Sequence, residues 1–338
     1  MKKLITLTVL VFYFNSSFSQ GCCSGGTTNP IAGGAATGVL KQHQFELSTN
    51  HQFLSSDRFY FQSDDTIGAF DHFSSNYLFI RLDYGLSDKF TFSMASGYFL
   101  NKSKFDIEQQ NTLTDTISSS GASDLIILPR YVVLNKSAEN KKTEITIGLG
   151  MKLPLGSHND SSLIYSGQLG DFYAINPFIA QTTNGSIDII FYSFLFRSYF
   201  KQKINLFSNI LHVKTGYNSL GQKFGNYTSL GLFASRKLSS NFAFTLQLRA
   251  ELINRMVSAQ NVDLSLYNID VNSTGSYKVF FVPQLTYNKR DLAFFITSEL
   301  PVYQYVNGTQ MGSKIQLTSG INYRFKIKKS NYTTEENN

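Results

Sequence analysis

Ser313 to Ile327, with the sequence SKIQLTSGINYRFKI, alternates between apolar and polar side chains almost without interruption. The apolar positions are Ile315, Leu317, Ile321, Tyr323 and Phe325, and the polar positions between them are Gln316, Thr318, Gly320, Asn322 and Arg324. Successive side chains of a β-strand point to opposite faces, so this period of two predicts a strand with one apolar and one polar face. The pattern recurs along the chain behind an export signal. We therefore predict an all-β protein, a transmembrane antiparallel up-and-down β-barrel with lipid outside and a polar lumen inside.

The export signal occupies residues 1–20. Lys2 and Lys3 precede an apolar run from Leu4 to Phe14, and small residues follow at Ser17 and Ser19. The run is too short for a membrane-spanning helix but is typical of a cleaved secretory signal. We expect cleavage near Ser19 or Gln20 and a mature protein in the bacterial outer membrane.

Cys22 and Cys23 are the only cysteines, and they lie just beyond the expected cleavage site. One interpretation is a lipoprotein acylated on Cys22, although Ser19 stands where a lipoprotein signal normally carries a branched aliphatic residue. Adjacent cysteines join only through a strained ring, so pairing with another chain is the alternative. Because the rest of the chain has no cysteine, no cysteine-based metal site is expected.

Composition supports one barrel domain over residues 39–327, preceded by a glycine-rich leader over 21–38 and followed by a polar tail over 328–338. The 338 residues are 16% charged and include 30 Phe and 19 Tyr but no Trp, so Tyr is expected at the membrane interfaces. No apolar run after residue 20 reaches the length of a membrane helix. The net charge of +7 comes largely from solvated turns, so we expect no nucleic-acid partner.

Connections between the strands alternate in length. Leu78–Leu86 and Phe90–Tyr98 alternate around a tight turn at Ser87–Lys89, and similar short turns are expected at Thr183–Gly185, Leu238–Ser240 and Asn288–Asp291. Longer polar loops are expected near 56–74, 102–120, 157–170, 257–275 and 307–312. Outer-membrane barrels have short periplasmic turns and longer external loops. We predict about twelve strands; fourteen stays open, because Ser186–Tyr217 reads as one strand or as two.

The same alternation predicts which charged and amide side chains line the lumen. A Lys or Arg facing lipid at mid-membrane costs about 2–4 kcal/mol, so these residues should point inward. The lumen-lining candidates are Arg81, Asp83, Glu144, Lys152, Gln247, Arg249, Glu251, Gln284 and Glu299. They either pair with one another to fill a narrow lumen, which we favour for most of them, or form a substrate site.

Catalysis is not expected. His72 and Ser74 have the spacing that places both side chains on one face of a strand, as an outer-membrane phospholipase uses, but a separate orienting residue is not evident. The histidines are scattered, and no phosphate- or dinucleotide-binding motif occurs. We therefore predict no enzyme, no catalytic residues, no cofactor and no metal.

Several segments resemble a known family of outer-membrane proteins. Gly121-Ala122-Ser123-Asp124-Leu125 and Pro129-Arg130-Tyr131 resemble a strand of the MetA-pathway-of-phenol-degradation proteins. IGLGMKLPLG at 147–156 resembles the glycine-rich strand that follows in that family, and LPVYQYVNGTQM at 300–311 resembles its last hairpin. The leader resembles that of related barrels from the Bacteroidetes. The resemblance implies a barrel grouped with transporters of aromatic hydrocarbons and, more distantly, with long-chain fatty-acid channels. It carries over no site residues.

From these features we expect a monomeric channel or transporter for small hydrophobic or aromatic molecules. Phe280, Val282 and Phe295 fall on the inward face, which favours a hydrophobic path. The alternative is a structural or surface-interaction barrel without transport activity. The expected partners are membrane lipid, lipopolysaccharide, the barrel-assembly machinery and a small hydrophobic solute.

The leader is expected to act as a plug, with Gly33 and Gly34 as candidates, because glycine-rich backbone threads a lumen without side-chain clashes. Deleting residues 24–37 should then raise the single-channel conductance of the refolded protein in planar bilayers. Conductance unchanged by the deletion would eliminate the plug.

Overall fold

The computed structural model describes residues 38–68, 70–105, 116–168, 170–267, 269–314 and 316–326. The signal peptide over 1–20, the plug candidates Gly33 and Gly34, and the tail over 328–338 lie outside these residues.

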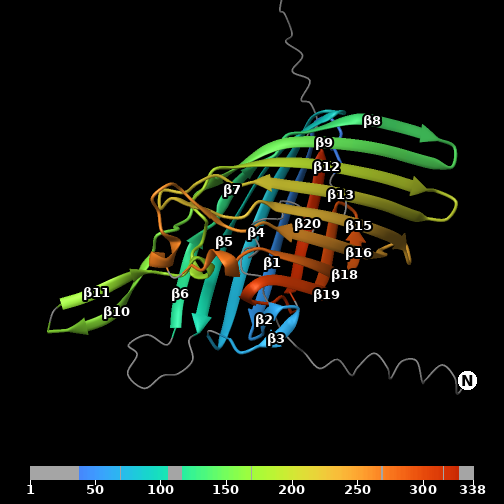
Figure 1. Ribbon diagram of the computed structural model, residues 1–338. Helices are drawn as coiled ribbons and strands as arrows, with labels where there is room; N and C mark the ends of the chain where they lie inside the picture. Colours follow the sequence, from blue (N-terminus) through green and yellow to red (C-terminus); the bar gives the residue numbers. More distant parts are fainter. Residues whose placement is uncertain are drawn as a thin grey trace, which may run out of the picture.

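The described chain forms a closed antiparallel barrel with twelve strand positions, which confirms the predicted fold class and strand count (Figure 1). Eleven positions are single strands: β1 (Gln44–Ser56), β4 (His72–Ser87), β5 (Phe90–Phe105), β9 (Lys141–Pro154), β12 (Asp188–Tyr199), β13 (Ile204–Lys214), β15 (Tyr227–Lys237), β16 (Phe242–Ile253), β18 (Ser276–Lys289), β19 (Leu292–Met311) and β20 (Gln316–Lys326). The twelfth is interrupted and consists of β6 (Thr116–Ala122), β7 (Asp124–Ile127) and β8 (Arg130–Ala138).

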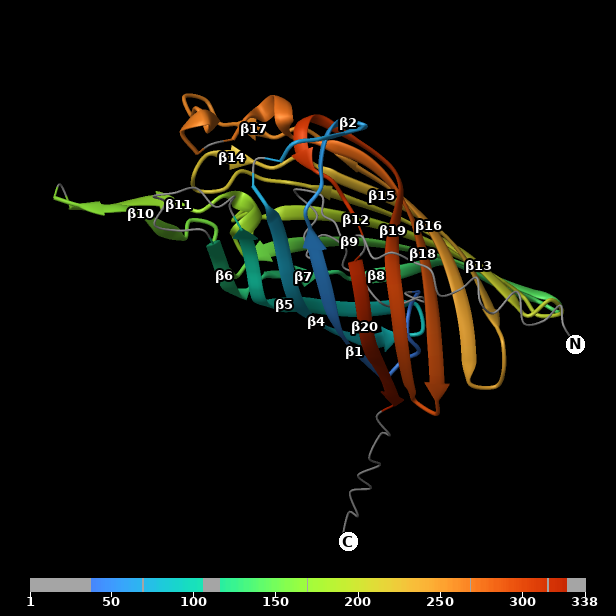
Figure 2. The same cartoon turned by 90° about the horizontal axis from the view of Figure 1, so that it is seen from below.

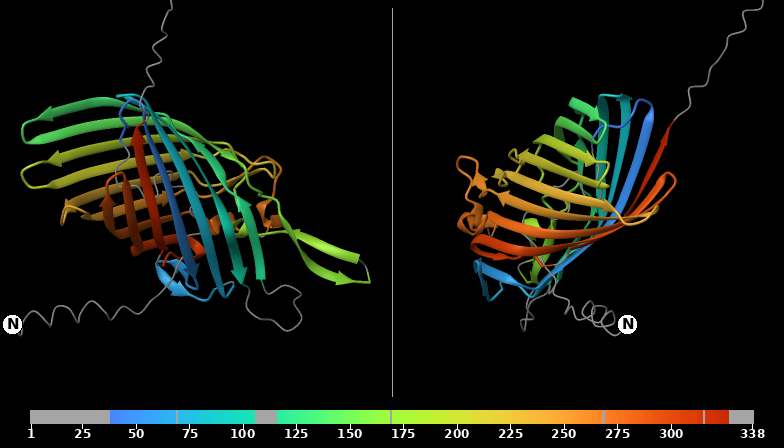
Figure 3. Two further views of the ribbon diagram at one scale, coloured as in Figure 1. Left: turned by 180° about the vertical axis from the view of Figure 1, so that it is seen from behind. Right: turned by 90° about the vertical axis from the view of Figure 1, so that its right-hand side faces the viewer.

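The ring closes between the first and last strands. β1 pairs with β20 from Gln44 opposite Lys326 to Leu54 opposite Gln316, and β1 pairs with β4 on its other edge. Viewed from behind and from the side, the wall continues from blue β1 round to red β20 (Figure 3). Every wall strand therefore has a hydrogen-bonded neighbour on both sides.

The interruption between β7 and β8 falls at Leu128 and Pro129. Proline has no backbone N–H, so it cannot complete a ladder hydrogen bond, and the strand breaks there. The wall stays connected, because β7 and β8 both pair with β5 and with β9.

The longer connections gather at one end of the barrel, opposite the short turns (Figure 2). They contain β2 (Phe59–Gln62), β3 (Asp64–Thr66), β10 (Ser161–Gly167), β11 (Gly170–Ile175), β14 (Gln222–Lys223) and β17 (Val257–Ser258), with the 3₁₀ turns η1 (Phe178–Ala180), η2 (Leu264–Tyr267) and η3 (Val271–Ser273). The β10–β11 hairpin projects beyond the wall. We call this end the loop end and the other the turn end.

Outward-facing side chains form an apolar band around the wall. On β4 the outward Leu78, Ile80 and Leu82 are exposed, whereas Phe79 and Arg81 between them are buried. The two faces predicted from the alternating sequence are thus the outer and inner faces of the wall. In the described ranges, no helix has the length and apolar character needed to cross a membrane.

One expectation about the connections was wrong, and one open alternative is resolved. Thr183–Gly185 is not a turn-end hairpin: it lies at the loop end, just before β12, with Thr183 buried. Gly185 has a φ of +75°, a backbone conformation that glycine adopts readily. Ser186–Tyr217 contains two strands, β12 and β13, joined by a short turn over residues 200–203.

A charged side chain at the centre of the apolar band should lower the free energy of unfolding. Leu232 lies midway along β15 and is exposed, so Leu232→Arg should lower the free energy of unfolding by about 2–4 kcal/mol in lipid vesicles, measured by urea titration. Leu238→Arg is the matched control, since Leu238 is exposed in the following turn. Equal losses for both variants would contradict the placement of the band.

Candidate functional site in the barrel lumen

The inner wall carries a large apolar cluster. Its buried members are Tyr77, Phe79, Ala95, Phe99, Ile126, Leu128, Ile190, Tyr192, Phe194, Phe207, Leu211, Val213, Tyr227 and Ile253. Phe207 stacks on Phe233 with ring centroids 4.5 Å apart, and Tyr77 lies 4.6 Å from Phe99. These residues come from strands on both sides of β9, whose Gly148 and Gly150 lie between exposed outward side chains. The cluster gives part of the lumen an aromatic and aliphatic lining.

A first ion-pair network lies on the inner wall toward the turn end. Asp83 accepts from Arg81 Nε at 2.9 Å and from Arg130 Nη2 at 2.8 Å, and the pairs are nearly fully buried. Glu46 on β1 accepts from Arg324 Nε at 2.7 Å and lies 3.5 Å from Arg81 Nη2. Charge-assisted hydrogen bonds of this kind offset the cost of burying the ions.

A second network joins β16 to β19. Arg249 donates to both carboxylate oxygens of Glu299, at 2.9 and 2.5 Å, and its Nε lies 3.0 Å from Glu251. The Tyr227 hydroxyl donates to Glu251 at 2.8 Å, and the Arg249 guanidinium lies 4.9 Å from the ring centroid of Phe280. The guanidinium is thus held in place by two acids and one aromatic ring.

A third charged group lies at the loop end. Lys152 Nζ lies 3.1 Å from Asp124 and 2.8 Å from Asp188, and all three side chains are at most 2% exposed. Lys152 also donates to Asn184 Oδ1 at 2.9 Å, and Thr183 donates to Asp124. Residues 183 and 184 are therefore tied to two wall strands, β7 and β9.

The segment over residues 176–186, here called the mouth segment, crosses the loop end. Lys102 on β5 donates to the Gln181 carbonyl at 2.6 Å. Ile179 packs in a small core with Phe59, Phe73 and Met311. Phe178 also packs against the neighbouring core around Phe224 and Met256. The segment is therefore anchored on several sides at the loop end.

The remaining sequence-predicted residues are placed as follows. Glu144 is buried and accepts from Lys142 at 2.8 Å, and Gln284 donates to Thr286 at 3.0 Å. Gln247 is half-buried on β16. The structure brings Arg81 to Asp83 and Arg249 to Glu251 and Glu299, but it places Lys152 in the separate loop-end group. His72 lies near the loop end, bonded to Asp71 at 2.7 Å.

Sequence reasoning missed several charged members of these groups, namely Glu46, Asp124, Arg130 and Asp188. Glu46 shares an inward face with Ser48, Asn50 and Gln52, so the alternation of β1 contained the signal. Asp124 and Arg130 lie beside the strand break, and Asp188 is the first residue of its strand. At such positions the alternating pattern is too short to predict which way a side chain points. Over the described ranges, no group of three His, Cys, Asp or Glu side chains is placed to hold a metal ion.

An apolar groove marks the strand break in the wall. It has a volume of about 630 Å³ and is lined partly by outward side chains such as Tyr131, Leu149 and Phe191. Its lining also includes Arg130 and Tyr192, both of which are buried. A Cβ on Gly150 would collide with the Ile127 carbonyl oxygen, so glycine allows β9 to approach the break closely.

Comparison with known proteins identifies the fold. No family model matches the chain, and no curated protein matches its sequence. An outer membrane channel from Pseudomonas putida F1 aligns over 86% of this chain and 98% of its own, with a TM-score of 0.62 and 11% identity. The NanC porin aligns over 84% and 100% (TM-score 0.41, 12% identity), and a Pseudomonas aeruginosa FadL homologue over 92% and 100% (TM-score 0.38, 7% identity). The chain is similar in fold to an outer-membrane channel.

Removing Lys152, the cation of the loop-end group, should strongly destabilise the protein. Lys152→Met leaves two buried carboxylates unpaired, so the free energy of unfolding should fall by about 3–5 kcal/mol in a urea titration. The mouth segment should also become sensitive to protease. Lys142→Met is the control for the mouth segment, because Lys142 pairs with Glu144 away from the loop-end group, so the protease sensitivity of the mouth segment should not change. Adding Asp188→Asn to Lys152→Met should recover part of the loss; no recovery would show that repulsion between the acids is not the cause.

Proposed function

We propose that the protein is an outer-membrane channel that passes or binds small hydrophobic or aromatic molecules. The observation that carries the proposal is the inward-facing apolar cluster. Its aromatic rings face the lumen of a barrel whose other inner surfaces are charged. Each aromatic contact contributes about 0.5–1.5 kcal/mol beyond simple burial, so a solute with an aromatic ring would have a binding surface that a sugar lacks.

The groove at the strand break supports the same proposal. It is apolar, and its lining combines outward side chains with the buried Arg130 and Tyr192. The exposed outward side chains of the groove would offer a hydrophobic solute an apolar surface on the bilayer side of the wall. The mouth segment would then restrict entry from the loop end.

A structural or surface-interaction barrel is the second candidate, and the ion pairs favour it. Arg249, Glu251 and Glu299 satisfy one another, as do Arg81, Asp83 and Arg130, so these groups fill space without offering a charged binding site. The two candidates differ in one measurable property, which is whether a solute crosses the barrel.

The export signal and the fold support placement in the outer membrane. Delivery by the barrel-assembly machinery, a monomeric state, contact with lipopolysaccharide and the absence of catalysis belong to the proposal. The lumen-lining residues predicted from the sequence are assigned to shaping the path, with Arg249 and Glu251 as positions to substitute first.

Swelling of proteoliposomes in arbutin and in sucrose tests the transport function. Both solutes are neutral, but only arbutin carries an aromatic ring, so the channel should admit arbutin faster. Phe194→Ser, on the inward face of β12, should lower the arbutin-to-sucrose ratio about 2- to 10-fold through the lost aromatic contact. Phe281→Ser is the matched control, because Phe281 is also a wall phenylalanine but lies on the outer face of β18, away from the groove, and is 38% exposed.

Each outcome of the swelling experiment decides between the candidates. Liposomes that swell no faster than empty ones in either solute would favour the structural barrel. If arbutin and sucrose gave equal swelling rates, or if Phe194→Ser and Phe281→Ser had equal effects, the protein would still be a channel but the aromatic path would be rejected.

A further inference from the structure

Basic side chains encircle the turn end of the barrel. The exposed Lys and Arg side chains there, here called the basic collar, are Lys41, Lys89, Lys136, Lys141, Arg197, Lys201, Lys203, Arg236, Lys237, Lys289, Arg290, Arg324 and Lys326. The exposed acids at this end of the described chain are Asp88, Glu139 and Asp291. The collar thus carries a large excess of positive charge, even though Arg324 is also paired with Glu46.

The collar is continuous around the circumference. Each of the short turns, between β4 and β5, β8 and β9, β12 and β13, β15 and β16, and β18 and β19, contains at least one basic residue or is flanked by one on an adjoining strand. Arg324, Lys326 and Lys41 cover the seam where β20 meets β1. A protein partner would cover one side of a barrel, whereas lipid surrounds it on all sides. The ring distribution therefore favours a lipid partner.

Outward-facing aromatic side chains lie immediately beside the collar on the same strands. Phe45 stacks on Tyr84 and on Phe325, with ring centroids 4.4 and 5.5 Å apart. The ring centroids of Tyr287 and Phe242 lie 5.1 Å apart. In outer-membrane barrels such aromatic girdles mark the boundary between hydrocarbon and headgroups. The collar begins where this girdle ends, which places its charges at the depth of the lipid phosphates.

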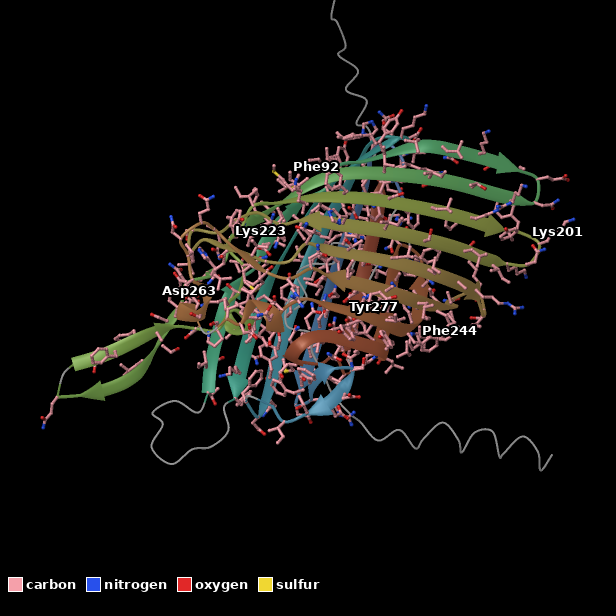
Figure 4. The ribbon with its side chains drawn as sticks, in the orientation of Figure 1. Phe92, Lys201, Lys223, Phe244, Asp263 and Tyr277 are labelled. Carbon is pink, nitrogen blue, oxygen red and sulfur yellow. The ribbon has the colours of Figure 1, made fainter. Side chains whose placement is uncertain are left out.

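The loop end has the opposite charge balance. Its exposed acids are Asp57, Asp64, Asp65, Asp71, Asp171, Asp263 and Asp270, against the exposed Arg58, Lys214 and Arg255 among the described residues. Backbone N–H donation from Ser265 lowers the pKa of Asp263. Lys201 and Asp263 lie at opposite ends of the barrel (Figure 4). The collar is therefore a local feature and not a consequence of the overall charge.

We propose that the basic collar binds the phosphate groups of anionic phospholipids in the leaflet at the turn end. If the short turns are periplasmic, this is the inner leaflet of the outer membrane. A Lys or Arg near an anionic surface contributes about 1 kcal/mol, and the attraction weakens with salt. The collar would hold the turn end against that leaflet and fix the depth of the barrel independently of transport.

The test compares lipids in contact with the full mature protein refolded into phosphatidylcholine vesicles. Electron paramagnetic resonance measures the motionally restricted fraction of spin-labelled phosphatidylglycerol and of spin-labelled phosphatidylcholine. We expect about a fivefold preference for phosphatidylglycerol, corresponding to one basic contact per bound lipid. The preference should fall toward unity at 1 M NaCl. No preference at low salt would overturn the proposal and leave the collar to an acidic protein surface.

A matched pair of triple variants assigns the preference to the collar. Lys136→Gln, Lys201→Gln and Lys237→Gln together remove three charges from the turn end, and Arg58→Gln, Lys214→Gln and Arg255→Gln remove three from the loop end. Only the first set should reduce the preference, at least twofold. Equal reductions by both triple variants would show that the lipid preference depends only on net charge, and would overturn its assignment to the collar. Lys201→Gln alone provides a smaller reduction in the same direction if the triple variant folds poorly.

Discussion

The structure depends on closing a ring of backbone hydrogen bonds. A strand in hydrocarbon has no water to satisfy its N–H and C=O groups, so every wall strand needs a partner on both edges. Pairing of β1 with β20 over eleven residue pairs supplies the last two edges. Once the ring is closed, each side chain has only two directions available, and the apolar residues take the outward one. The band, the lumen and the two chemically different ends all follow from that closure.

The ring tolerates one local break because its neighbours compensate. Pro129 interrupts the strand between β7 and β8, yet both segments pair with β5 and β9. Gly148 and Gly150 on β9 lack the side chains that would crowd the break. The result is an apolar groove in the wall beside the buried Arg130.

The lumen has two kinds of inner surface, and a water-filled pore would not need both. Aromatic and aliphatic residues form one of them, and paired arginines and carboxylates form the other. A buried ion requires a partner within hydrogen-bonding distance, because an uncompensated charge in a region of low dielectric is costly. The apolar cluster packs beside these pairs on the inner wall. The mouth segment is held at the loop end by Lys102, Lys152 and two small cores.

The sequence by itself determined which residues face lipid and which face the lumen, because a period of two leaves no other choice. It therefore predicted the barrel, its twelve strands and the inward positions of Arg81, Asp83, Arg249 and Glu251. It did not determine which charged residues form ion pairs. Arg249 binds Glu299, fifty residues later in the chain, because the register of β16, β18 and β19 brings the two side chains together. It also misplaced Thr183–Gly185, because an Asn-Gly pair is typical of a hairpin turn whereas here the segment is held at the loop end by contacts with Asp124 and Lys152. Partners and positions of this kind depend on the stagger of the closed ring, which is a property of all twelve strands together and of no single segment.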